Sequence, residues 1–195
     1  TYFDQRDEKN AVLIEQILEN DLPDFCQEYF VGISTRTSVL TRLNYAYDLR
    51  TFFNYIVKKI PRFKQKSTKE ITPVDIESLS PFEIEAFINY VEIYKDSDGR
   101  LVKNGERGKS RKLSAIRSLV KFFVKKQVIR VDPTTSVDMP KLHDKEIVRL
   151  EGREVDAMMD VVDNGTGLSE RQQKYAENTR VRDLAIVSLL LGTGI

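Results

Sequence analysis

The sequence predicts an all-α fold in two parts, for three reasons. Apolar residues recur at three- and four-residue steps through most of residues 8–132, which is the period of helices that bury one face. Alternating apolar and polar runs, which are typical of strands, are scarce. A stretch that contains prolines and few apolar residues then has the composition of a linker. We therefore expect a helical domain over residues 1–132, a linker over 133–147 and the helical start of a second domain over 148–195.

The first helices are delimited by prolines. Residues 8–19 and 22–31 are expected to form one broken helix, with the break near Pro23. A longer helix is expected over residues 34–59, and Pro61 ends it because the proline ring cannot continue a helix. The period of this helix predicts one buried stripe, which consists of Val39, Leu43, Ala46, Leu49, Phe53 and Ile56.

The next helix has a clear start signal. Ser80 is the expected N-cap, Pro81 takes the first helical position and Glu83 completes a capping box. The turn dipeptides Asp98-Gly99 and Asn104-Gly105 follow, and they predict a loop or a small hairpin around residues 100–103. The residues of this helix that we expect to be buried are Ile84, Phe87, Ile88 and Val91.

Residues 100–130 form the most strongly charged window of the chain. It holds eleven basic residues and one acid, Glu106, a net charge of +10 in a chain whose total is +1. A helix is expected here that stops near Asp132-Pro133. Its buried stripe would be Leu113, Ile116, Val120, Phe123 and Val124, and another face would carry Ser110, Ser114, Arg117, Lys121 and Lys125.

A helix that is buried on one side and offers hydroxyls and cations on the other suits a phosphate backbone. The alternative is an ordinary solvated helix face, but the cations here lack the interleaved Glu residues of a salt-bridged surface helix. Acidic and basic blocks also alternate along the chain: residues 1–30 carry −6, residues 50–70 carry +6 and residues 70–98 carry −7. A helical fold would allow the two basic blocks to share one face.

Composition excludes several classes of site. Cys26 is the only cysteine, so the chain forms no internal disulfide, and a reducing compartment is expected. Between Phe25 and Tyr29 it is expected to be a small buried hydrophobe, not a nucleophile. His143 is the only histidine, which excludes metal sites built on two histidines or on a His–Cys cluster. No apolar run approaches the ~18 residues of a membrane span.

The second region predicts helices at residues 151–162, 169–176 and 182–191, with Gly192-Thr193-Gly194 as the final cap. The last helix is the most apolar one and has too few partners in residues 146–195. Because the chain also starts at Thr1 without a signal-like segment, we expect a fragment whose second domain is incomplete. The inward residues of the first of these helices are expected to be Val155, Met158, Met159 and Val162.

Five stretches, in order, resemble motifs of the tyrosine recombinase (phage integrase) family over roughly residues 25–195. The first consists of Thr41, Tyr45, Asp48, Leu49 and Phe52. The second is Ser110-Arg111-Lys112-Leu113-Ser114-Ala115-Ile116-Arg117-Ser118-Leu119, followed by Asp132-Pro133. The third is Met139-Pro140-Lys141 and the fourth contains Glu154-Val155. The fifth runs from Arg182-Asp183-Leu184-Ala185 to Leu190-Leu191-Gly192-Thr193-Gly194-Ile195.

The resemblance implies two domains that clamp duplex DNA. The first would be a SAM-like core-binding domain of four to five helices, with its second and fourth helices at the DNA. The second would be the truncated helical start of a mixed α/β catalytic domain, in which a tyrosine forms a 3′-phosphotyrosyl link while Arg, Lys and His residues stabilise the phosphorane. No metal or nucleotide cofactor is implied.

The resemblance also implies which functional residues this chain holds. The family's first catalytic Arg would directly follow Ile195 and the nucleophilic Tyr would lie further on, so no catalytic residue is expected here and the chain alone should cleave no DNA. The implied partner is a double-stranded recombination site, bound by a dimer and synapsed as a tetramer, in the cytoplasm of a bacterium or at the nucleoid. The residues expected to face the duplex are Arg36, Thr37, Thr41, Lys109, Ser110, Arg111, Lys112, Ser114, Arg117 and Lys121.

Two stretches, 96–107 and 163–181, exceed the minimal family pattern. They leave the subfamily open between a mobile-element integrase, a phage integrase and a chromosome-dimer resolvase. Two functions from other classes also remain open. One is a non-enzymatic helical DNA-binding regulator, and the other is a helical protein-interaction module that uses the acidic residues 1–30.

Overall fold

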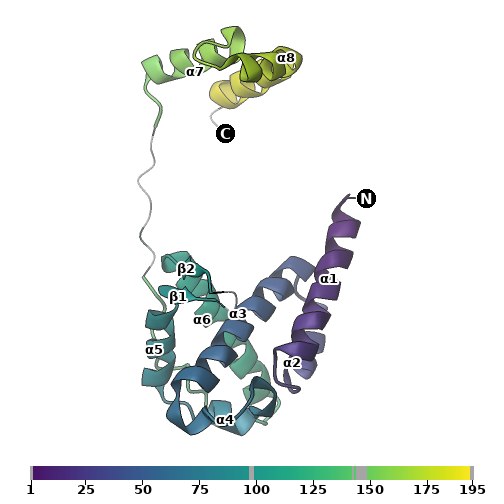
Figure 1. Cartoon of the computed structure of the whole chain (residues 1–195), viewed down its shortest axis with the longest axis vertical. Helices are drawn as coiled ribbons and strands as arrows, with labels where there is room; N and C mark the ends of the chain where they lie inside the picture. Colours follow the sequence, from purple (N-terminus) through teal and green to yellow (C-terminus); the bar gives the residue numbers. More distant parts are fainter. Residues whose placement is uncertain (1, 97–98, 142, 144–148, 194–195) are drawn as a thin grey trace. The chain divides into compact units, whose positions relative to one another are not determined.

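The computed structural model of the chain describes residues 2–96, 99–141, 143 and 149–193, and it divides into a first unit, Thr1–His143, and a second unit, Asp144–Ile195. The described residues are mostly helical, with one two-stranded sheet, which confirms the predicted all-α class (Figure 1). None of the described helices is long and apolar enough to cross a membrane. Part of the predicted linker, at positions 142 and 144–147, lies outside the described residues.

Two helices open the first unit. Helix α1 (Tyr2–Asn20) starts earlier than the predicted helix, and α2 (Cys26–Ile33) starts later than predicted. The predicted break lies between them, where Leu22 and Pro23 are buried in the turn. The backbone N–H groups of residues 21 and 22 both donate to the carbonyl of Ile17, which ends α1.

Helix α3 (Val39–Lys59) is the central helix of the first unit. It begins at the N-cap Ser38, whose hydroxyl accepts from the backbone N–H of Thr41, so it starts five residues after the predicted position. It ends at Lys59, as the sequence predicted from Pro61. Of the predicted stripe, Leu43, Ala46, Leu49, Phe53 and Ile56 are buried and Val39 is half-buried.

Short elements connect α3 to the next long helix. They are the 3-10 turns η1 (Pro61–Phe63) and η2 (Thr68–Glu70), then α4 (Pro73–Glu77) and α5 (Pro81–Tyr90). The predicted capping box of α5 is confirmed, because Ser80 Oγ accepts from the N–H of Glu83 while the Glu83 carboxylate accepts from the N–H of Ser80. Ile84, Phe87 and Val91 are buried as predicted, and Ile88 is half-buried.

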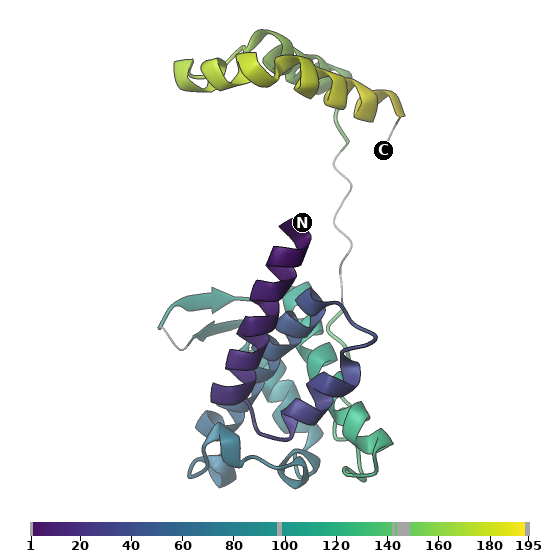
Figure 2. The ribbon, with the colours of Figure 1, turned by 90° about the vertical axis from the view of Figure 1, so that its right-hand side faces the viewer.

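A β-hairpin resolves the predicted choice between a loop and a hairpin. Strands β1 (Ile93–Lys95) and β2 (Leu101–Lys103) pair antiparallel, with Tyr94 opposite Val102. These two side chains are half-buried, whereas the alternate positions on both strands are exposed. Residues 97–98 of the connecting turn, which include the predicted turn residue Asp98, lie outside the described residues. The hairpin projects from the helices of the first unit (Figure 2).

Helix α6 (Glu106–Lys125) carries the basic window, but it ends earlier than predicted. The chain leaves the helix through Gln127, whose φ of 60° is left-handed, and the N–H of Val128 bonds back to the carbonyl of Phe123. The sequence offered no glycine at this position, so the helix end was missed. The predicted stripe is confirmed, with Leu113, Ile116, Val120 and Phe123 buried and Val124 half-buried.

The core of the first unit is rich in aromatic rings that meet edge to face. Phe25 contacts both Phe53 and Phe123, and Phe52 contacts Phe87, with ring centroids 5.1–6.1 Å apart. Cys26 is fully buried beside them as a free thiol, and burial raises the pKa of this thiol. The prediction that Cys26 is a small buried side chain is therefore confirmed.

The second unit consists of α7 (Gly152–Asn164) and α8 (Glu170–Thr193). The prediction of separate helices at 169–176 and 182–191 is wrong, because the polar segment between them contains no glycine or proline and continues the helix. Residue 194 of the predicted cap lies outside the described residues. The predicted inward residues of α7, Val155, Met158, Met159 and Val162, are only half-buried, and no described residue of this unit is buried.

Candidate nucleic-acid interface

Helices α3 and α6 pack against each other along a line that we call the α3–α6 seam. A side-chain cluster fixes its register: Asp48 of α3 accepts from Lys112 Nζ at 2.7 Å and from Arg111 Nη2 at 3.1 Å. The other terminal nitrogen of Arg111 donates to Asn44 Oδ1 at 2.7 Å. Tyr29 of α2 also donates its hydroxyl hydrogen bond to Ser118 at 2.8 Å, which fastens the other half of α6.

Asp48 is an ionisable group inside this seam, with a side chain that is 0% exposed. Burial raises the pKa of its carboxyl, while the charges and hydrogen bonds of Lys112 and the charge of Arg111 act in the opposite direction. Two cations share this one carboxylate. The cluster therefore keeps a net positive charge, and Arg111, whose side chain is 43% exposed, carries that charge to the surface.

The position of Lys112 differs from the predicted one at the DNA. Its side chain is 6% exposed and points to Asp48, so it does not face outward as predicted. The helical period contained the signal, because Lys112 lies four residues before Ile116 and eight before Val120, on the buried stripe itself. A buried lysine requires a carboxylate partner, and Asp48 provides it from the facing helix.

Arg117 is also positioned differently from its prediction. It is half-buried, and its Nη2 donates to the backbone carbonyls of Thr134 and Val137. The guanidinium therefore fastens the segment after α6 to the middle of that helix. Lys109 is half-buried as well and pairs with Glu92 at 2.9 Å. These two cations are held by contacts within the protein.

A groove of about 690 Å³ lies between the turn after α2 and the second half of α6, and we call it the basic groove. It brings together the predicted residues Arg36, Thr37 and Lys121, although they lie far apart in the sequence. The list of predicted DNA-facing residues omitted Lys126 and also Lys125, which the sequence had placed on the cationic stripe, and the structure adds both to the same groove. Among the described residues that line it there are four cations and no carboxylate.

The groove is built on a fixed turn. Arg42 of α3 donates to the backbone carbonyls of Ser34 and Thr37 at 2.8 and 2.7 Å, which holds the segment that carries Arg36. Lys126 pairs with Glu28 and lies over the ring of Phe122. The described residues offer no ion-pair partner within 4.0 Å to Arg36, Lys121 or Lys125, which are all exposed. The groove therefore presents positive charge to solvent.

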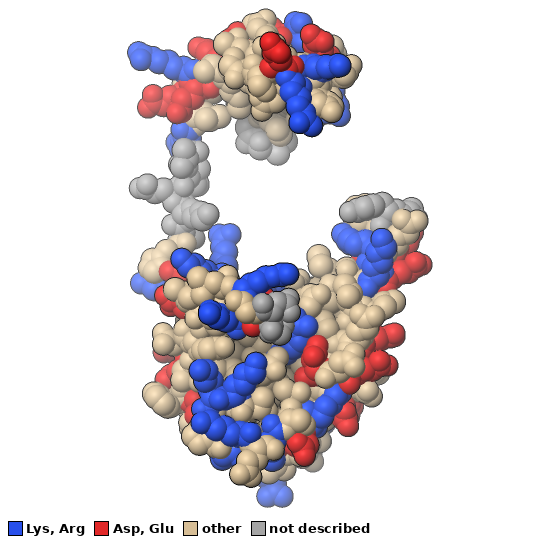
Figure 3. Space-filling model, viewed as in Figure 1, with Lys and Arg blue, Asp and Glu red and all other residues tan. Residues whose placement is uncertain are grey.

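The remaining predicted residues lie on α3 and α6. Thr41, Ser110 and Ser114 are half-buried, and the hydroxyl of Thr41 lies 2.9 Å from that of Ser38. In Figure 3, Lys and Arg side chains cover the area of α3 and the hairpin, whereas Asp and Glu gather along the side formed by α1. The segregation of charge that the sequence blocks predicted is thus present on the surface of the first unit.

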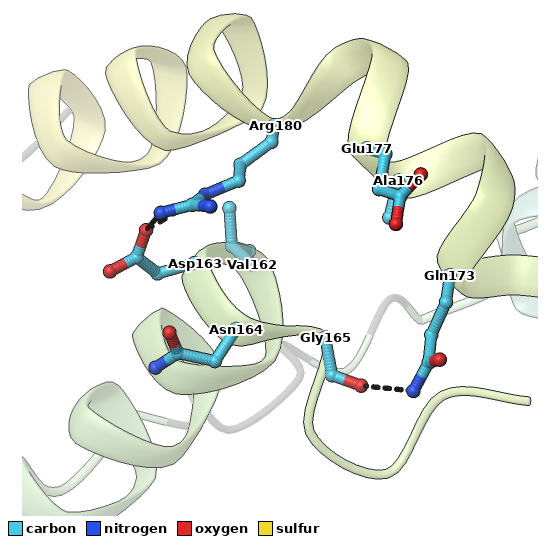
Figure 4. A pocket seen from close by; sticks show the side chains of 8 residues that line it. All are labelled: Val162, Asp163, Asn164, Gly165, Gln173, Ala176, Glu177 and Arg180. Carbon is cyan, nitrogen blue, oxygen red and sulfur yellow. Dashed lines mark hydrogen bonds and ion pairs between the residues drawn. The ribbon is translucent and has the colours of Figure 1, made fainter.

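The second unit has a pocket between α7 and α8, and two bonds join groups of its own lining (Figure 4). Arg180 pairs with Asp163 at 2.8 Å, and Gln173 donates to the carbonyl of Gly165 at 3.5 Å. Glu177 adds a second carboxylate to the lining. This pocket has no surplus of positive charge with which to hold an anion.

Several curated proteins are similar to this chain. Tyrosine recombinase XerC of Leptospira interrogans is 22% identical over 151 residues, which are 77% of this chain and 39% of that protein. Tyrosine recombinase XerD of Lacticaseibacillus casei is 33% identical over 86 residues, 44% of this chain and 26% of that protein. Tyrosine recombinase XerC of Bacillus licheniformis is 35% identical over 81 residues, 38% of this chain and 26% of that protein.

No family model and no solved structure matches the chain. The aligned part of the chain spans 39% or less of the length of these curated relatives. All of them carry the name of the family whose motifs the sequence resembles. The matches confirm that this chain is similar to tyrosine recombinases, as its motifs suggested.

Proposed function

We propose that this chain is the DNA-binding part of a site-specific tyrosine recombinase, and that its first unit binds duplex DNA over the α3–α6 seam and the basic groove. The observation that carries the proposal is the basic groove, in which four cations from two distant segments meet and the described lining holds no carboxylate. The similarity to curated tyrosine recombinases supports the same function.

The two parts of this surface would contribute differently to binding. Exposed cations such as Arg36, Lys121 and Lys125 suit phosphates and supply affinity without sequence preference. Short hydroxyl side chains on the helices, such as Ser110 and Ser114, suit contacts that fix the position of the helix on the backbone or reach base edges. The proposed partner is therefore a double-stranded recombination site, and Lys112 and Arg117 serve the fold beneath this surface.

Binding to a duplex selected from a random pool, measured by fluorescence anisotropy at several salt concentrations, tests the proposal. If about five cations contact phosphates, the logarithm of affinity falls against the logarithm of salt with a slope of about −4 to −5. Replacing Lys121 and Lys125 by Ala should make the slope shallower by about 2. The matched control replaces Lys9 and Lys64, which are exposed and outside the groove, and it should keep the slope. Binding that is indifferent to salt would refute the proposal.

For the parent protein we propose strand exchange through a 3′-phosphotyrosyl intermediate, carried out by a dimer on each site and a tetramer in the synapse. Integration or excision of DNA in a bacterial cytoplasm is the biological setting that we propose. By the family motif that residues 182–195 resemble, the first catalytic Arg is expected after Ile195, so we expect this chain alone to form no covalent adduct with a nicked suicide site. An adduct that forms with this chain and maps to one of its own tyrosines would contradict this assignment.

A further inference from the structure

A second cationic pocket lies beside the α3–α6 seam, where the β-hairpin packs against α3. We call it the hairpin pocket; its volume is about 240 Å³, and α3, α5, the hairpin and α6 all line it. Strand β2 and the turn before it belong to the stretch that exceeds the family pattern, residues 96–107, and the motifs in the sequence did not identify this pocket. Its lining differs from that of the basic groove, because tyrosines accompany the cations.

Three tyrosines from three elements form one wall of the pocket. Tyr55 of α3 lies against Tyr90 of α5 with ring centroids 5.0 Å apart, and Tyr90 lies against Tyr94 of β1 at 5.6 Å. Burial raises the pKa of both Tyr55 and Tyr90, so their hydroxyls keep their protons at neutral pH. A protonated phenol is a hydrogen-bond donor, which is the group that an anion requires.

The charge of the lining is positive. Five cations and two carboxylates line the pocket. Asp48 is one of the carboxylates, and it is buried behind Lys112 and Arg111. Asp96 accepts from the backbone N–H of Arg100 within the hairpin turn. The exposed residues Lys58 and Lys95 have no ion-pair partner within 4.0 Å among the described residues.

The size and position of the pocket indicate which ligand it suits. A pocket of about 240 Å³ is smaller than the ~300–1,000 Å³ of sites for drug-sized ligands, and it suits a phosphate with part of its sugar. Arg111 belongs to the seam and also lines the pocket, so a DNA strand that follows the seam continues over the pocket. We propose that the hairpin pocket seats a backbone phosphate of the bound DNA, held by Lys58, Lys95 and Arg111 with the tyrosine hydroxyls as further donors. This proposal rests on the proposed function and extends it to the hairpin.

Ethylation interference and affinity measurements on variants of the full chain test it. The double variant Lys58→Ala/Lys95→Ala should bind duplex about tenfold more weakly at physiological salt. It should also lose the ethylation interference at one end of the site and keep the interference elsewhere. The matched control is Lys103→Ala with Lys64→Ala, since Lys103 is exposed on the same hairpin outside the pocket lining. Circular dichroism should show the same thermal unfolding for both pairs. Tyr94→Phe keeps the ring and removes the hydroxyl. It should reduce the interference at the same end of the site, but less than the double lysine variant does.

The outcomes separate this proposal from the proposed function. If the unmodified 195-residue chain binds no duplex, the proposed function fails and the hairpin proposal fails with it. If the unmodified chain binds duplex and the Lys58/Lys95 double variant binds with the same affinity and the same interference pattern, the hairpin proposal alone is overturned. A second experiment titrates the chain with inorganic phosphate and monitors the NMR signals of the hairpin. If phosphate shifts these signals and duplex does not displace it, the pocket binds free phosphate and the DNA proposal is wrong.

Discussion

Asp48 and Lys112 show why single residues of a charged helix have to be assigned individually. The charge run predicted Lys112 at the DNA, although its spacing from Ile116 and Val120 is that of the buried stripe. The structure follows the period, because the carboxylate of Asp48 on α3 lies 2.7 Å from the ammonium. The sequence thus contained both halves of the ion pair. These two residues are 64 positions apart in the chain, and only the packing of α3 against α6 joined them.

Removing the shared carboxylate should be costly for stability. We expect Asp48→Ala to lower the free energy of unfolding by about 3–5 kcal/mol, because it leaves the buried ammonium of Lys112 without a partner. Urea denaturation followed by circular dichroism measures this change. Glu85→Ala, at an exposed position, is the control and should stay within about 0.5 kcal/mol of the parent. A loss below about 1 kcal/mol for Asp48→Ala would show that the cluster does not stabilise the seam.

The ionisation of Glu83 should make the free energy of unfolding depend on pH in the acid range. The hydrogen bond from Arg62 and the backbone N–H of Ser80 hold the pKa of Glu83 below its ordinary 4.5. A carboxyl whose pKa is lowered on folding contributes stability above its unfolded pKa, and this is lost as pH falls through the folded value. We therefore expect Glu83→Gln to destabilise the chain at pH 7 and to change stability little below the folded pKa. Thermal melts across pH 2–7 measure this, and an equal effect at both ends would contradict it.

At the scale of elements, the sequence predicted the existence and buried faces of the helices better than their ends. The stripes of α3 and α6 were correct because burial of one face determines the helical period. The end of α6 was missed because Gln127 adopts a left-handed conformation that glycine usually takes. The groove was predicted in part, since Lys121 and Lys125 shared the predicted cationic stripe of α6, whereas the turn after α2 meets them only in the folded structure.

Gly32 of α2 permits the close approach of α2 to α6. A Cβ at this position would lie 2.2 Å from Cε2 of Phe122, so the ring would have to move. We expect Gly32→Ala to destabilise the first unit by about 1–2 kcal/mol, because overpacking outweighs the gain in helix propensity. Denaturant unfolding checks this.

Two controls accompany the Gly32 variant. Gly152→Ala meets no atom within 4 Å and should be close to neutral. In a Phe122→Ala background the obstruction is gone, so Gly32→Ala should no longer destabilise the chain. If Gly32→Ala lowers the free energy of unfolding by the same amount in both backgrounds, contact with Phe122 is not the cause of the destabilisation.

At the scale of the whole molecule, burial is distributed very unevenly. Every buried core residue among the described ones lies between Ile14 and Val137, within the first unit. The helices of the second unit contain apolar side chains that stay exposed, such as Val181 and Leu189. The sequence predicted this asymmetry from the apolar helix that lacks partners, because residues 146–195 hold too few residues to cover it.

The first unit should therefore carry both the cooperative fold and the proposed DNA surface. A fragment of residues 1–143 should unfold in one transition with the same midpoint as the full chain, because it keeps all of the buried core described here. Its duplex affinity and salt slope should match those of the full chain, since the seam, the basic groove and the hairpin pocket all lie within it. A fragment of residues 144–195 should show no cooperative transition, because none of its described residues is buried. Calorimetry and fluorescence anisotropy on the two fragments measure these properties. A cooperative melt of the second fragment, or a loss of duplex binding by a folded first fragment, would show that residues 144–195 contribute a core or a DNA contact of their own.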